Sequence, residues 1–430
     1  MQWILCGTLV ILLLIIYQLD KKDVTTPSII SIAVYLISSI FFAINANKWE
    51  IYLNISTILL IISALVIFFI GTKIHLTKKT VANKTDGNFE KNINYYYKVP
   101  KKIIIVLFLF NCIATFFIYR RAMQIAVSYS TSSYMLANIR SALADSVSWG
   151  VGISIFRESM YAIGYTCLCV FMINCIPQFK LRVKKNLYIL LPVLPMFVAM
   201  FFSTGRTGFI RAFVVVFAAG LLKYTYFYKV HIGKFVKIGG TVFVILLIVF
   251  VQLGKATGKS QIFAPFDMLS VYIGSSIGAL NEYMKKPESF STVFAGETLY
   301  GIRALLKMIN SNIISTEVAL PFTYVKGGYN TNVYTSLRRY INDFGILGMY
   351  IIQFFKGVLY GSWSYNLKKY KNIGLFFILY SYFIYDIFMQ SIEENFLREF
   401  LTIAQIFILI VFVLVYNICI KPYKSSEKLF

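Results

Sequence analysis

Long apolar runs separated by short polar segments fill most of the chain. Each run has about 16 to 21 residues, close to the ~20 residues that an α-helix needs to cross a hydrocarbon core of ~30 Å. The predicted spans cover residues 3–19, 29–45, 51–71, 103–119, 158–176, two short spans within 187–222, and then 238–253, 341–360, 373–391 and 401–420. This pattern predicts an all-α polytopic membrane protein with about eleven transmembrane helices, in which residues 1–430 form one membrane domain.

One apolar stretch, residues 187–222, is too long for a single crossing. Its roughly 36 residues would form a helix of about 54 Å, nearly twice the thickness of the hydrocarbon core. The polar segment 203–208, which includes Arg206, interrupts it. The stretch therefore predicts a hairpin of two short spans with Arg206 at the outer tip. Pro192 and Pro195 should kink the first span.

The polar segments differ in charge and length. Residues 72–102 hold eight lysines and no arginine, and we interpret them as a flexible basic loop on the cytoplasmic side. Residues 120–157 form a smaller outer loop, and residues 254–343 form one large outer loop that carries amphipathic helices. More than half of the 42 Lys and Arg residues, but few of the 18 acidic residues, fall in the segments assigned to the inside. This bias predicts an outer N-terminus and a cytoplasmic C-terminus.

The net charge of +24 bears on the choice of partner. Such a charge can indicate a nucleic-acid-binding protein. Here the basic residues gather in short loops between apolar runs, as they do on the cytoplasmic side of membrane proteins. We therefore expect a lipid bilayer and no nucleic acid as the partner.

The large outer loop predicts two amphipathic helices. In the first, Asp267–Lys285, Gly274 and Gly278 form a GxxxG pattern that lets a helix or a lipid chain come close, with plain helix packing as the alternative. The second is Glu297–Asn310. Its Tyr300, Arg303 and Lys307 share one face, which suits a diphosphate or, alternatively, simply meets lipid headgroups.

A third helix precedes the span at 341–360 and is dense in polar side chains. These are Asn332, Tyr334, Thr335, Arg338, Arg339, Asn342 and Asp343. Adjacent arginines suit an anionic ligand, because a guanidinium offers two parallel N–H donors. Two alternatives stay open: an ion pair of Arg339 with Asp343 four residues on, and an anchor at the membrane interface.

Charged residues also fall inside the predicted spans. Arg206 lies at the N-terminal end of an outgoing helix, where free N–H groups favour an anion. Arg211 lies about one turn deeper, and an intramembrane arginine needs a partner. We predict Asp386 as that partner, or alternatively as an acid–base group. Lys356 should extend its amine towards the cytoplasm.

Several familiar motifs are missing from the sequence. It has no Walker A loop, no GxGxxG before a helix and no cytoplasmic DxD motif. It has no cluster of His and Cys residues with metal-ligand spacing, so we expect neither a cofactor nor a metal. Because the outside of a cell holds no pool of nucleotide sugars, a glycosyl donor there would be lipid-linked.

Three motifs resemble a known family. They are Phe202-Ser-Thr-Gly-Arg-Thr-Gly208, Tyr272-Ile-Gly-Ser-Ser-Ile-Gly-Ala-Leu-Asn-Glu282, and Asn332-Val-Tyr-Thr335 followed by Asp343-Phe-Gly345. With the span count and the one large outer loop, the chain from about residue 103 onward resembles the Wzy-type polymerases of oligosaccharide repeat units in O-antigen, lipopolysaccharide and capsule synthesis. The resemblance implies a cytoplasmic-membrane glycosyltransferase that joins undecaprenyl-diphosphate-linked oligosaccharides at the outer face. A chain-length regulator and a flippase would be its partner proteins.

The resemblance also implies roles for individual residues. The residues that would bind substrate and its diphosphate are Arg206, Arg211, Arg303, Arg338, Arg339, Asn332, Tyr334 and Tyr272. The carboxylates that could act as base towards the acceptor hydroxyl are Glu282, Glu297 and Asp343. A transporter or flippase, an O-antigen ligase-like transferase and a scaffold of a secretion complex are the alternatives. Both histidines fall in loops assigned to the cytoplasm, which favours polymerase over ligase, because the ligases use an outer-loop histidine.

Overall fold

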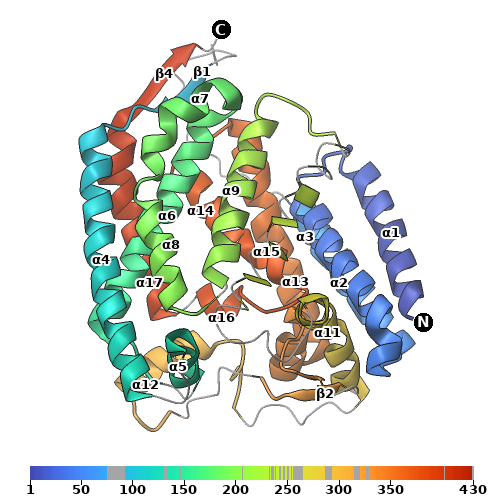
Figure 1. Ribbon diagram of the computed structural model, residues 1–430. Coiled ribbons are helices and arrows are strands. Elements are labelled where there is room, and N and C mark those ends of the chain that lie inside the picture. The colour runs from blue at the N-terminus through green and yellow to red at the C-terminus, as the bar shows by residue number, and fades with distance from the viewer. Residues whose placement is uncertain are drawn as a thin grey trace.

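Helices form nearly all of the regular structure in the computed structural model (Figure 1). The structure describes residues 1–74, 93–129, 134–144, 147–205, 207–231, 265–285, 293–313, 320–325, 329–400 and 402–428, with scattered residues between 233 and 254. The first nine helices are α1 (Gln2–Leu19), α2 (Pro27–Trp49), α3 (Ile55–Lys73), α4 (Lys101–Ser128), α5 (Met135–Ala144), α6 (Val151–Cys175), α7 (Phe179–Asn186), α8 (Val193–Phe202) and α9 (Thr207–Thr225). The later helices are α11 (Pro265–Lys285), α12 (Tyr300–Ile309), α13 (Ser336–Tyr370), α14 (Leu375–Phe383), α15 (Tyr385–Met389), α16 (Leu397–Phe400) and α17 (Ile403–Leu414).

Short strands and irregular helical turns complete the fold. Two antiparallel ribbons pair β1 (Ile93–Tyr97) with β4 (Lys424–Lys428) and β2 (Thr323–Val325) with β3 (Tyr329–Thr331). The 3₁₀ turns span Leu187–Leu190 and Lys421–Tyr423, and a π-helical turn spans Val415–Ile420. Strand β1 lies within the segment 72–102 that we predicted as a flexible loop, of which residues 75–92 lie outside the described part.

The described helices confirm an all-α polytopic membrane protein. Seven are long and apolar enough to cross a bilayer: α1, α2, α3, α4, α9, α13 and α17 with the turns after it. An eighth crossing arises if α7, its 3₁₀ turn and α8 are counted as one span, which bends by 60° just before Val193. The bend lies at Pro192, as predicted, whereas Pro195 lies within α8. Ser203–Gly205 separates α8 from α9, which confirms the break in the long apolar stretch. The structure describes only scattered residues of the predicted span 238–253.

The buried apolar side chains form two clusters, each within its own group of helices. The first group packs α1, α2, α3 and α11 around the first half of α13, and the second packs α4, α6, α8, α9, α14, α15 and α17 together. In Figure 1 the first group lies on the right and the second on the left. Outward-facing residues such as Leu59, Val106 and Ile351 are large and exposed, because lipid rather than water surrounds these helices.

Glycines allow the closest helix contact, between α3 and α13. A Cβ added to Gly357 would lie 2.2 Å from the carbonyl oxygen of Phe68, and one added to Gly71 would lie 2.3 Å from that of Phe354. A Cβ added to Gly361 would likewise lie 2.6 Å from the carbonyl oxygen of Thr72. The sequence Gly357–Gly361 is thus a GxxxG contact that holds two membrane helices backbone to backbone.

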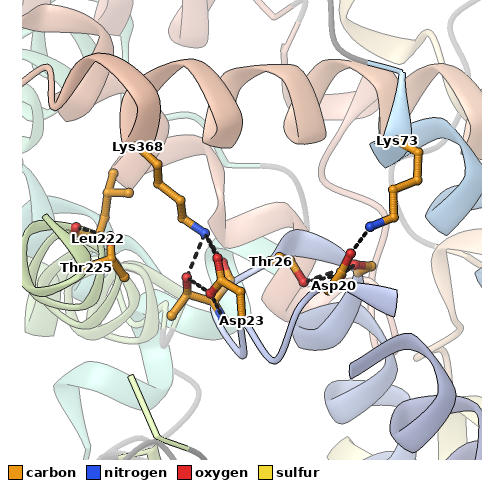
Figure 2. Close-up of polar contacts among 9 residues, drawn as sticks. Asp20, Asp23, Thr26, Lys73, Leu222, Thr225 and Lys368 are labelled. Carbon is orange, nitrogen blue, oxygen red and sulfur yellow. Dashed lines mark hydrogen bonds and ion pairs between the residues drawn. The ribbon is translucent and has the colours of Figure 1, made fainter. Parts of the chain in front are cut away.

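The two ends of the bundle carry different elements (Figure 1). We call the end with α7, β1, β4 and the C-terminus the tail end, and the end with α5, α12 and β2 the loop end. Figure 2 shows how the connection between α1 and α2 is held at the tail end. Lys368 of α13 lies 2.9 Å from Asp23 and donates to the Thr25 hydroxyl at 2.7 Å, while Lys73 of α3 pairs with Asp20.

Candidate functional site

The first turn of α13 turns its arginines inward. Arg338 is 0% exposed and Arg339 is 4% exposed, although both lie at the loop end of the helix. The backbone N–H of Ser336 donates to the carbonyl of Gln390 at 2.9 Å, which ties this turn to the end of α15. Gly345, with φ of 69° and ψ of −179°, then breaks the helix, so that residues 336–344 are set apart from the membrane part of α13.

Arg338 occupies the centre of this cluster. Its guanidinium forms an ion pair with Glu297, which lies just before α12. The same group lies 5.0 Å from the ring centre of Tyr283 and 5.2 Å from that of Tyr334. Arg339 donates to the carbonyl oxygen of Glu297 at 3.3 Å. Two arginines and two rings therefore converge on one carboxylate-bearing turn.

Asp343 positions that turn. Its carboxylate accepts the backbone N–H groups of Glu297 at 3.1 Å and of Thr298 at 2.6 Å. The side chain thus fixes the segment that carries Glu297. Partial burial raises the pKa of Glu297 above its ordinary value, against the charges of Arg338 and Arg339, and Asp343 adds to the rise.

The segment between α15 and α17, which separates the predicted spans 373–391 and 401–420, brings further charges to this place. Glu394 is 1% exposed and accepts the Tyr340 hydroxyl at 2.8 Å and the Leu397 backbone N–H at 2.7 Å. Burial raises the pKa of Glu394, and the charge of Asp386 adds to the rise. The neighbouring Glu393 forms an ion pair with Arg398.

Arg211 does not pair with Asp386, so that prediction was wrong. Its guanidinium forms an ion pair with Glu399, donates to the Tyr382 hydroxyl at 2.9 Å and lies 4.3 Å from the ring centre of Tyr385. Asp386 instead pairs with Lys356 of α13 at 2.7 Å. Consecutive residues of a helix point about 100° apart, so Tyr385 faces α9 while Asp386 faces α13. Lys356 is buried in this pair and does not extend to the cytoplasm, contrary to the prediction.

These contacts join into one charged layer at the loop end of the bundle. The charge of Arg339 interacts with those of Arg398 and Glu394, and Arg398 interacts with Glu399, which binds Arg211. We use the term charged layer for Arg211, Glu297, Arg338, Arg339, Glu393, Glu394, Arg398 and Glu399. Four arginines and four glutamates from four separate parts of the chain thus lie within reach of one another.

Three predicted residues of the outer segment lie outside the charged layer. Glu282 pairs with Lys285 one turn on at 2.6 Å and is partly exposed. Tyr272 lies near Arg140 of α5. Arg303 of α12 donates to the carbonyl of Phe294 at 3.3 Å. Glu282 is thus paired with Lys285, whereas Asp343 binds the backbone of the turn that carries Glu297.

The predicted third helix begins later than its sequence suggested. Helix α13 starts at Ser336, so Asn332 and Tyr334 precede it. Tyr334 donates its hydroxyl to the carbonyl of Pro321 at 3.2 Å and places its ring against Arg338, whereas Asn332 is half-buried beside β3. Arg206, the predicted hairpin-tip residue, lies outside the described residues.

The GxxxG pattern of α11 serves helix packing. A Cβ on Gly274 would lie 2.6 Å from the backbone nitrogen of Phe42 in α2, so the two helices touch along this face. Asn281, next to Glu282, accepts the backbone N–H of Asn54 at 2.8 Å and so holds the start of α3. The packing alternative is the one that the structure supports.

Sequence reasoning missed the charges of the 390–400 segment. The run Glu393-Glu394-Asn395-Phe396-Leu397-Arg398-Glu399 is an acid-rich turn between two apolar stretches, and that density was a usable signal. No local signal marks Tyr283, whose ring meets Arg338 only because α11 crosses the start of α13.

No family model matches the chain, and neither a curated protein nor a solved structure matches it.

Proposed function

We propose that this protein is a membrane glycosyltransferase that polymerises oligosaccharide repeat units carried on undecaprenyl diphosphate. The observation that carries the proposal is the pairing of buried Arg338 with Glu297 beside Arg339 at the loop end. An anion-binding group and a carboxylate of raised pKa are the two parts that such a transfer needs. The resemblance to the Wzy-type polymerases supports the same activity.

The arginines of the charged layer would hold the donor diphosphate. In the transfer, a new bond forms between the acceptor hydroxyl oxygen and the anomeric carbon of the donor sugar, while the bond from that carbon to the diphosphate oxygen breaks. The leaving diphosphate takes the electron pair, and guanidinium groups stabilise its charge. Arg338 and Arg339 are the nearest pair to Glu297, and Arg211 lies at the other side of the layer.

Glu297 would take the proton of the acceptor hydroxyl. A bound diphosphate competes with Glu297 for Arg338, so substrate binding releases the carboxylate from its ion pair. Desolvation then keeps the pKa of Glu297 above its ordinary value, which suits a general base. Asp343 keeps the turn in place throughout, because it binds two backbone N–H groups of that turn.

The proposal includes a membrane orientation. We propose about eleven spans in the cytoplasmic membrane, with the N-terminus outside and the C-terminus in the cytoplasm. The loop end, with the charged layer, then faces the outside, where the lipid-linked substrate is presented. The lysine-rich tail end faces the cytoplasm. A chain-length regulator and a flippase would work beside the enzyme.

One observation favours a second candidate, a transporter of lipid-linked oligosaccharides. Lys356 and Asp386 form an ion pair inside the bundle, and such intramembrane pairs mark ion and substrate pathways in transporters. The two candidates differ in product. A purified polymerase extends a lipid-linked oligosaccharide beyond one repeat unit, whereas a transporter moves it unchanged.

Lysine replacements in the charged layer test the proposed function. Arg338→Lys keeps the charge but loses the planar fork and the contacts with the two rings. Losing one charge-assisted hydrogen bond costs about 1.5–3 kcal/mol, so we expect roughly a ten- to hundredfold lower rate of polymer formation, with single-repeat product accumulating. Arg339→Lys and Arg303→Lys, assayed in parallel, show whether the site extends to those residues.

The readout is polymer length on a gel, normalised to the amount of protein in the membrane. Arg120→Lys is the matched control, because Arg120 is exposed on α4 and lies outside the charged layer. Near-normal polymer from Arg338→Lys and Arg339→Lys together would contradict the proposal.

A further inference from the structure

A second cationic cluster lies at the opposite end of the bundle, around a buried lysine. Lys223, in the last turn of α9, is 3% exposed. Its ammonium donates to the carbonyl oxygen of Tyr95 in β1 at 3.3 Å. The rings of Phe227 and Tyr226 lie 5.4 Å and 5.8 Å from the same ammonium. The lysine is therefore held by a neutral carbonyl and two aromatic faces.

Three further cations surround Lys223. The charges of Arg182 in α7, Lys424 in β4 and Lys371 at the end of α13 all act on it. Arg182 lies 5.2 Å from the ring centre of Tyr96, and Lys424 lies 4.2 Å from that of Tyr95. Residues from four separate elements thus bring four basic side chains to one place.

The ribbon of β1 and β4 builds this cluster. Tyr97 pairs with Lys424 in the antiparallel register, which carries the C-terminal segment over the end of α9. Asn174 of α6 holds β1 by donating to the carbonyl of Tyr97 and accepting its N–H, both at 2.8 Å. Hydrogen-bonded backbone therefore fixes the positions of Lys424 and of the Tyr95 carbonyl that accepts from Lys223.

Three cations around a buried lysine repel its ammonium and one another, and burial costs a charge its hydration. In the described part of the chain, the ion pairs at the tail end involve Lys73 and Lys368, and none of them involves these four cations. An anion with several oxygens would offset both costs, because it can accept from several cations at once.

We propose that Lys223, Arg182, Lys371 and Lys424 form a binding site for a phosphate group. The phosphate would belong either to the headgroup of an anionic lipid or to a free phosphate ion. Basic clusters between membrane helices suit such headgroups, and Lys371 and Lys424 are exposed enough to meet a ligand at the surface. This site lies at the end opposite the charged layer and does not depend on the proposed glycosyl transfer.

Purified full-length protein in lipid nanodiscs tests the site. Thermal unfolding is measured in pure phosphatidylcholine, in phosphatidylcholine with phosphatidylglycerol, and in pure phosphatidylcholine with inorganic phosphate at constant ionic strength. We expect a higher melting temperature with phosphatidylglycerol, with phosphate, or with both. Stabilisation by phosphate alone identifies a soluble anion as the ligand, and stabilisation by phosphatidylglycerol alone identifies a lipid headgroup.

Two double variants separate the cluster from general surface charge. Arg182→Gln with Lys424→Gln removes two cations of the cluster, and Lys184→Gln with Lys185→Gln removes two exposed cations of the same helix α7. In binding of the stabilising ligand measured by native mass spectrometry, we expect roughly a thirtyfold loss for the first pair and less than about threefold for the second. Equal losses in both pairs, or no stabilisation of the parent protein by either ligand, would overturn the proposal.

Discussion

Lys356 of α13 and Asp386 of α15 form an ion pair of 2.7 Å in which the two side chains are 0% and 3% exposed. Lys356 also lies 3.5 Å from the side-chain oxygen of Gln390, whose carbonyl receives the first N–H of α13. The pair therefore joins two helices just beneath the charged layer. Breaking it would leave one charge buried without its partner, which is more costly than removing both.

The first prediction concerns that pair. Lys356→Met should lower the free energy of unfolding by about 3–5 kcal/mol, because it leaves Asp386 charged or forces it to bind a proton. The double variant Lys356→Met with Asp386→Leu should recover most of that loss. Thermal unfolding in detergent measures both. Lys48→Met is the control, since it breaks the exposed pair with Asp267 and should cost less than about 1 kcal/mol. A double variant no more stable than Lys356→Met would contradict the prediction.

The second prediction concerns the pH dependence of the reaction. If Glu297 is the base, its ionised form is the active one, so the rate of polymer formation should fall as the pH drops through its pKa. That pKa lies above the ordinary value of 4.5 because the group is desolvated. Glu297→Gln should remove this limb of the profile and lower the rate at every pH. The rate of the purified enzyme is measured between about pH 4.5 and pH 8. If the Glu297→Gln variant keeps the pH profile of the parent enzyme, another residue is the base.

The third prediction concerns the tail end shown in Figure 2. Burial would raise the pKa of Asp23, but the charge of Lys368 and the hydrogen bonds of Thr25 hold it below the ordinary value of 3.8. An acid whose pKa is lower in the folded state stabilises the fold above its unfolded pKa, and the gain is lost as the pH falls through the folded one. Asp23→Asn should therefore reduce the melting temperature near pH 6, and the gap between variant and parent should close towards pH 3.

The fourth prediction concerns the contact of α3 with α13. Gly357→Ala would place a Cβ 2.2 Å from the carbonyl oxygen of Phe68, so the helices must separate. We expect a loss of about 1–3 kcal/mol in stability. Gly7→Ala is the matched control, because nothing lies within 4 Å of its added Cβ, and alanine should be neutral or slightly stabilising in that helix. Equal melting temperatures for Gly357→Ala and the parent would show that the helices tolerate a wider spacing.

Local pattern by itself determined the membrane class and many of the elements. Long apolar runs must form helices, because only a helix satisfies its own backbone groups in lipid. The same reasoning located the break after α8, the bend at Pro192, and the amphipathic helices α11 and α12 within a few residues. These features depend on residues close together in sequence, so the sequence is sufficient to predict them. The density of polar residues around Arg338, Arg339 and Asp343 is also visible in the sequence.

Only the tertiary structure decided which charges meet. Arg211 and Asp386 both needed partners, but the sequence could not show that Tyr385 turns towards α9 and Asp386 towards α13. Nor could it show that Glu399 lies beside Arg211, 188 positions away in the chain. Successive side chains on a helix point about 100° apart. A helix break such as Gly345 also changes the direction in which the side chains after it point. Pairing inside a membrane bundle is therefore a property of how the helices pack, because intramembrane charges take whichever partner the packing places beside them.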